Sequence, residues 1–199
     1  MRKHKQMVGR IKMVRSHKRT RNILVAAALL VVLVGAGSAQ VLNSGAKPIA
    51  LNATLTESVS VTLSASAVNF TLTAGSPANA GSTSITATTA WTLRPSRLTL
   101  NLYSFFASSA VALTDGAGNN IPSSAFSISN NGGAFNTLTN TVPFGGANAG
   151  LLLSSTPILG FNKSGSRTDL MKFNINLSGS PNLPAGVYTG TLTIQAQAI

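Results

Sequence analysis

Cysteine is absent from this 199-residue chain, and histidine occurs only at positions 4 and 17. Without a thiol, the chain can form no disulfide, use no cysteine nucleophile and carry no lipid on cysteine. The lack of imidazole after residue 17 removes the commonest catalytic base and the usual zinc or copper ligand from the rest of the chain. We therefore expect no catalytic residue, no metal site and no cofactor, and a fold that is stable without cross-links.

Acidic residues are scarce as well, because Glu57, Asp115 and Asp169 are the only three. A glycosidase needs two carboxyl groups at a fixed separation, so an enzymatic role would require Glu57 and Asp169 to converge in a cleft. A serine–lysine pair is formally open, but no motif marks one. The stretch TDGAGNN, residues 114–120, offers few oxygen ligands for calcium and is predicted to be a hairpin turn. The sequence predicts a protein that is not an enzyme.

Positive charge is concentrated at the N-terminus. Nine of the fifteen Lys and Arg residues lie in the first 21 positions, and an apolar run, ILVAAALLVVLV, follows at residues 23–34. A basic region, a short apolar run and then small residues are typical of a secretory signal peptide. Gly37 and Ala39 place cleavage after Ala39. We predict a signal peptide over residues 1–39, with the start at Met1, Met7 or Met13, and secretion to the periplasm or cell surface.

Two alternatives share part of this N-terminal pattern. A nucleic-acid-binding arm is also rich in Lys and Arg, but an apolar run does not normally follow it. A transmembrane anchor needs about 20 apolar residues, and this run approaches that length only if residues 35–39 are included. Residues 40–199 carry six basic and three acidic side chains. We therefore expect no nucleic-acid partner, and membrane contact only through the signal peptide before cleavage.

The remainder of the chain has a side-chain period of two, which is typical of half-buried strands. Residues 40–50 are predicted to be a flexible lead-in and residues 51–199 a single domain. Leu51 to Leu63 is predicted as the first strand, with Glu57 marking a bulge, a bend or a break. Pro95 is expected to end a strand, because proline has no N–H for the ladder. The other strand candidates are residues 67–75, 82–93, 97–106, 110–115, 124–129, 140–144, 150–155, 169–179 and 189–199.

About eight to ten short strands joined by Gly-, Pro- and Asn-rich turns favour an all-β fold. We predict an antiparallel immunoglobulin-like or pilin-like β-sandwich. A barrel is the alternative, but an outer-membrane barrel would need aromatic girdles, and eleven aromatic residues are spread along the domain. Trp91 shares its parity with Ile85 and is assigned to the core rather than to an exposed carbohydrate platform. Tyr103 and Phe105 either face outward as a contact patch or are returned to the core by a bulge.

The C-terminal stretch LPAGVYTGTLTIQAQ, residues 183–197, resembles the last strand of fimbrial-type and spore coat protein U-like secreted subunits of bacteria. In those subunits a Pro-Ala-Gly-x-Tyr turn leads into a final strand rich in threonine. The chain differs from many fimbrial subunits in having no cysteine pair and no aromatic residue near its end. The resemblance implies an incomplete sandwich that is finished by a strand from a chaperone or from the next subunit, which is β-augmentation.

The leading hypothesis is a non-enzymatic secreted bacterial subunit, pilin-like or coat-like, that acts in assembly or adhesion through strand edges. Residues 40 to about 57 are predicted to be the donated strand, because the odd positions from Leu51 to Leu55 are apolar. The alternative is a monomeric immunoglobulin-like binding module in the periplasm or outside the cell. The final strand has an uncharged outer face, and such an edge pairs readily unless it is covered.

Overall fold

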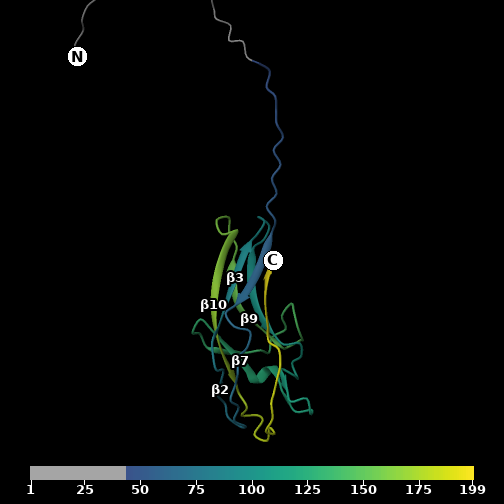
Figure 1. The fold of residues 1–199 in the computed structure, drawn as a ribbon, viewed down its shortest axis with the longest axis vertical. Coiled ribbons are helices and arrows are strands. Elements are labelled where there is room, and N and C mark those ends of the chain that lie inside the picture. Colours follow the sequence, from purple (N-terminus) through teal and green to yellow (C-terminus); the bar gives the residue numbers. More distant parts are fainter. Residues whose placement is uncertain (1–43) are drawn as a thin grey trace, which may run out of the picture. The chain divides into compact units, whose positions relative to one another are not determined.

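A computed structural model describes residues 44–199, which form an all-β fold with antiparallel sheets (Figure 1). The only helical element in this range is a 3-10 turn at Ser123–Ala125. The prediction of eight to ten strands is an undercount. The described residues contain eleven strands, four of which have only two or three residues: β1 (Ser58–Leu63), β2 (Asn79–Ala80), β3 (Ile85–Thr92), β4 (Thr99–Phe105), β5 (Leu113–Thr114), β6 (Asn120–Ile121), β7 (Phe126–Asn130), β8 (Phe135–Thr137), β9 (Gly150–Pro157), β10 (Ser164–Ile175) and β11 (Thr193–Ala198).

The larger sheet has six strands in the order β1-β3-β10-β7-β8, and β2 pairs with β10 off this path. The smaller sheet has three strands in the order β11-β4-β9, and β5 and β6 form a separate hairpin. The first and last strands are therefore both edge strands, in different sheets. β1 and β11 lie beside each other without forming a ladder.

The two larger sheets share one hydrophobic core. Its buried residues come from β3, β7 and β10 on one side and from β4 and β9 on the other, and β11 packs against it through Ile194 and Ala196. The predicted inward parity is confirmed for β3 and β10, because Ile85, Ala87 and Trp91 are buried, as are Met171, Phe173 and Ile175. The assignment of Trp91 to the core is confirmed. Its indole Nε1 donates to the carbonyl of Asn162 at 3.0 Å.

Tyr103 and Phe105 are buried, which excludes the outward contact patch and leaves the bulge, the other of the two alternatives. The register of β4 against β9 shifts between Leu102 and Tyr103, which is the anticipated bulge. Neither aromatic ring joins the main core cluster. Instead, the ring of Phe144 covers them, with centroids 6.1 Å from Tyr103 and 5.8 Å from Phe105. Both faces of β4 are thereby buried.

Two other strand predictions are wrong. Residues 67–75 and residues 140–144 contain no strand, and each has only an isolated bridge, Phe70 to Gly81 and Asn140 to Gly150. The exposed strand β8 was not predicted, because it lies in a stretch rich in Gly and Asn that gave no strand signal. Pro95 does follow the end of β3, as expected. The stretch at residues 114–120 forms the turn between β5 and β6, as predicted.

At the N-terminal side the chain divides into two units, residues 1–52 and residues 53–199. The predicted signal peptide and its cleavage site lie outside the described residues, as does part of the lead-in. The prediction of one half-buried strand from Leu51 to Leu63 is wrong, because the ladder begins at Ser58 and residues 44–56 are exposed. Glu57 marks this break. Among the described residues, no helix is long and apolar enough to cross a membrane.

Candidate functional site

Two segments of the fold have the side-chain alternation of strands but almost no backbone partners. In residues 64–74, which follow β1, Val68, Phe70 and Leu72 pack against the core, and their neighbours in sequence are exposed. In residues 183–192, which precede β11, Tyr188 and Leu192 do the same. We call these the first and the second rim segment. Each has apolar side chains fixed by packing and a backbone that is largely free to accept another strand.

The backbone hydrogen bonds of the rim segments are few in the part of the chain that the structure describes. Between residues 65 and 72 only Asn69 makes them, both to Ser82. Between residues 185 and 192 only Thr189 makes them, both to Thr114. Backbone N–H and C=O groups almost always find partners in a folded protein. The rim segments therefore present donors and acceptors that an added strand could satisfy.

A groove of about 850 Å³, with an apolar floor and polar backbone along its edges, lies between the two rim segments. Its floor is the buried core of the protein, so the groove opens the core itself. Val68 and Leu72 line it on the first rim segment, and Tyr188 and Leu192 on the second. The floor is formed by Ile85, Phe106, Phe126, Met171, Phe173 and Leu177.

The second rim segment is held in place by a close approach of backbones. A Cβ at Gly190 would overlap the carbonyl oxygen of Ala112, so only glycine allows this contact. The hydroxyl of Tyr188 donates to the carbonyl of Pro184 at 2.9 Å, which closes the turn that begins the segment. Desolvation, together with nearby Asp115, raises the pKa of Tyr188 above its ordinary value. The Pro-Ala-Gly-x-Tyr stretch thus builds one wall of the groove.

Apolar side chains at odd-numbered positions are exposed in the residues that precede β1. Ile49, Leu51 and Leu55 are 82%, 89% and 85% exposed, and no strand includes them. Large aliphatic side chains are among those most often buried in proteins. These three side chains are two and four positions apart, so they lie on one face of an extended segment. This segment, residues 44–56, carries the face that a groove-filling strand needs.

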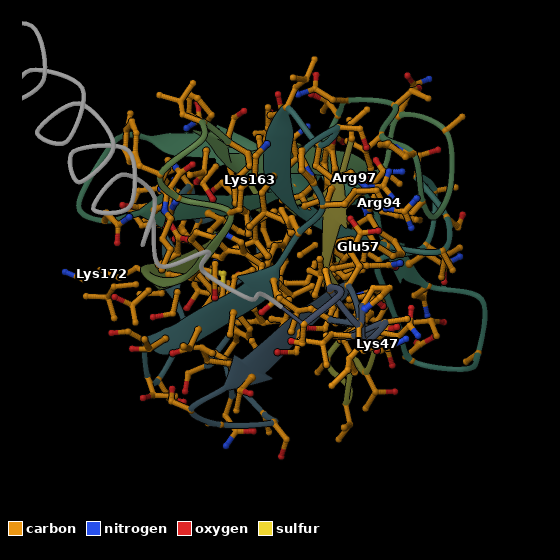
Figure 2. All side chains as sticks on the ribbon, turned by 90° about the horizontal axis from the view of Figure 1, so that it is seen from above. Lys47, Glu57, Arg94, Arg97, Lys163 and Lys172 are labelled. Carbon is orange, nitrogen blue, oxygen red and sulfur yellow. The ribbon has the colours of Figure 1, made fainter. Side chains whose placement is uncertain are left out.

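Glu57 fixes the point at which this segment leaves the domain (Figure 2). Its carboxylate accepts from Arg97 Nε at 2.8 Å and from Arg94 Nε at 2.9 Å. The hydrogen bond from Arg97 and the two positive charges lower the pKa of Glu57 to about 2. Lys163 supports the same turn, because its Nζ donates to the carbonyls of Pro95 and Arg97. We call Glu57, Arg94 and Arg97 the Glu57 ion-pair cluster.

The acidic residues do not converge as a catalytic pair would require. Ser58, next to Glu57, pairs with Thr92, whereas Asp169 pairs with Ala87. Those two positions are five residues apart on β3, or roughly 17 Å at about 3.3 Å per residue. The carboxylate of Asp169 is also fully buried and bonded to Arg167, Asn130, Asn131 and Ser154. The arrangement offers no cleft between two carboxyl groups.

Asp115 stabilises a turn. Its Oδ1 accepts from the backbone N–H groups of Ala117 and Asn119, and its Oδ2 accepts from the Asn119 amide. These bonds, chiefly the one from the Asn119 side chain, lower the pKa of Asp115. Over residues 44–199, no three residues of the types His, Cys, Asp and Glu are grouped so that they could hold a metal ion.

The chain matches no known protein-family model and no curated protein sequence. Its function therefore has to be argued from the groove. Sequence reasoning identified the apolar parity of the segment around Leu51 and Leu55, but it did not identify the groove. The sequence signal for it is the presence of two alternating runs, residues 67–75 and residues 183–192. In the fold, neither run belongs to a strand ladder.

Proposed function

We propose that the protein is a non-enzymatic, secreted bacterial subunit of a surface structure, in which residues 44–56 of one copy fill the groove of the next. In this proposal the domain is an incomplete immunoglobulin-like, pilin-like β-sandwich, similar to the fimbrial-type and spore coat protein U-like subunits that the C-terminal stretch resembles. The observation that carries the proposal is the coexistence of an apolar groove with unpaired rims and an exposed segment of alternating Ile49, Leu51 and Leu55.

Burial of apolar side chains and pairing of the rim backbones would both favour strand insertion. Full burial of one Leu or Ile side chain contributes about 1.5–3 kcal/mol, and the exposed segment offers three such side chains. The rim backbones add hydrogen bonds that are otherwise made to water, as in β-augmentation. Ordering the segment opposes this gain, at about 1–2 kcal/mol per residue for the backbone. Pro48 lowers this cost at its own position, because its ring fixes φ before insertion.

The position of Glu57 favours insertion into another copy over self-insertion. β1 starts beside the end of β3 at Thr92 and runs toward Ala87, and the groove begins at Leu63, its far end. The Glu57 ion-pair cluster holds the base of the segment at the start of β1. To enter its own groove, the segment would have to reverse at this fixed point and run back along the whole of β1.

Deletion of residues 40–56 tests this proposal. The proposal predicts that the wild-type mature chain forms polymers and that the deleted chain is a soluble monomer with the same far-UV circular dichroism. Polymers that survive the deletion would show that this segment is not the donated strand. Secretion is tested separately, by N-terminal sequencing of the exported chain, which should begin at residue 40.

A monomeric immunoglobulin-like binding module is the second candidate. It is favoured by the pairing of β1 with β3 inside the chain's own sheet, since the N-terminal strand of the domain is then already in use. Sizing the purified mature chain over a range of concentrations separates the two candidates. A monomer at every concentration supports the module, and concentration-dependent growth supports the assembling subunit.

A further inference from the structure

The end of the domain from which residues 44–56 depart carries an exposed apolar surface. Two turns meet there, residues 93–98 between β3 and β4 and residues 158–163 between β9 and β10. They are joined by hydrogen bonds from Ile158 N to the Leu98 carbonyl at 2.8 Å and from Leu93 N to the Lys163 carbonyl at 2.7 Å. We call this the apical end. Figure 1 shows the C-terminus at the same end.

Three large apolar side chains project from these two turns. Leu98 is 70% exposed, Leu159 52% and Phe161 86%. The turn that contains Leu159 and Phe161 is fixed by a bond from Asn162 N to the Leu159 carbonyl and by the Asn162 side chain, which accepts from Leu159 N and donates to Pro157. We call Leu98, Leu159 and Phe161 the apical patch. Exposed apolar side chains that are grouped on ordered turns are typical of an interaction site.

Charge is divided between the two ends of the domain. The apical end carries Arg94, Arg97 and Lys163 against the single acid Glu57. The opposite, basal end consists of the connections at residues 64–84, 106–125 and 176–192, which contain Asp115 and no Lys or Arg. A positive end and a negative end on one molecule favour head-to-tail contact between copies.

We infer that the apical patch of one copy docks on the basal end of the next copy, beside the groove that receives the strand donated by the first copy. This inference rests on the proposed function. The segment leaves one copy at its apical end, at Glu57, and the groove that receives it is lined by the basal connections 65–74 and 183–192. Insertion therefore brings the apical end of one copy against the basal end of the next. The apical patch buries its three side chains in that junction, and Val187, 80% exposed on the second rim segment, is a basal residue that meets it.

The experiment compares Phe161→Ser with the matched control Phe135→Ser in the full mature chain. Phe135 is 51% exposed and lies on β8, away from both ends. Because the chain has no cysteine, Ala53→Cys in a small fraction of the molecules of each variant can carry a single polarity-sensitive dye, whose emission shifts to the blue when the segment enters a groove. Assembly is followed by sedimentation velocity against protein concentration, and folding of each monomer by its melting temperature.

Phe161→Ser should raise the concentration for half-assembly about tenfold, which corresponds to about 1.4 kcal/mol. Its dye should still shift in the polymers that form, and Phe135→Ser should assemble as the wild type does. Raising the salt concentration should weaken wild-type assembly.

Equal assembly by Phe161→Ser and the control, with the dye shifted in both, overturns the apical junction and leaves strand donation intact. A dye that stays exposed in wild-type polymers overturns strand donation, and with it the junction. If Phe161→Ser instead reduces binding to anionic lipid vesicles and leaves assembly unchanged, the patch faces a membrane and the junction is also wrong.

Discussion

The hydroxyl of Ser154 lies 3.3 Å from Oδ2 of Asp169, and this contact joins the smaller sheet to the larger one. Ser154 is on β9, and Asp169 is on β10. The other carboxylate oxygen accepts from Asn130, Asn131 and Arg167 at 2.9–3.0 Å. A completely buried carboxylate is tolerated because each oxygen has donors.

Replacing Asp169 by Ala should therefore lower the free energy of unfolding by about 3 kcal/mol, because the partly buried donors of Asn130 and Arg167 lose an acceptor that lies inside the protein. Urea denaturation followed by circular dichroism measures the change. Arg167→Gln is the comparison. The free energy of unfolding of this variant should fall by about 1 kcal/mol. One third of the Arg167 side chain is exposed, so water can replace its bond to Asp169. A change below 0.5 kcal/mol for Asp169→Ala would show that the network is not a structural link between the sheets.

The stability that the Glu57 ion-pair cluster contributes should depend on pH. The pKa of Glu57 is about 2 in the folded protein, against an ordinary value of 4.5. A lowered folded pKa means that the cluster contributes stability above about pH 4.5 and loses it progressively as the pH falls toward 2. The stability difference between the wild type and Glu57→Gln should be constant from pH 6 to pH 8 and should vanish near pH 2.

Direct titration of the Glu57 carboxyl carbon by NMR checks this expectation. A midpoint near 4.5 would mean that the two arginines do not hold the carboxylate in solution. Arg97→Gln should raise the midpoint more than Arg94→Gln does, because the hydrogen bond from Arg97 is the largest cause of the lowered pKa.

Side-chain periodicity predicted which residues face the core, and it did so where the strands are long. The parity of Ile85, Ala87 and Trp91 on β3 holds, and so does that of Met171 and Phe173 on β10. Periodicity did not predict which segments have a ladder partner. Residues 67–75 alternate as cleanly as β3 does, yet a single bridge, Phe70 to Gly81, is their only pairing within the described residues. An alternating sequence specifies a face, whereas pairing depends on which backbone lies alongside.

The same distinction explains the wrong prediction near Leu51 and why parity left two alternatives open for Tyr103. Leu51 and Leu55 have the parity of a buried face, but both are exposed. Tyr103 has the parity of an outward face, but Phe144, some 40 residues later, covers it. The Asp169 network and the groove also combine residues distant in sequence. Single-sequence patterns carry no information on such contacts.

The central claim is that one face of residues 44–56 enters the groove of another copy. The parity of the segment provides a matched pair of variants: Leu51→Asp with Leu55→Asp, and Asn52→Asp with Thr54→Asp. Both pairs add the same charge to the same exposed segment, but only the first adds it to the apolar face. Unpaired carboxylates are strongly disfavoured in an apolar groove.

Sedimentation velocity of the mature chain and the two double variants, at one pH and over a range of concentrations, is the most direct measurement. The account predicts polymers for the wild type and for Asn52→Asp with Thr54→Asp, and a monomer for Leu51→Asp with Leu55→Asp. Equal behaviour of the two double variants, or a wild type that stays monomeric at every concentration, would contradict it.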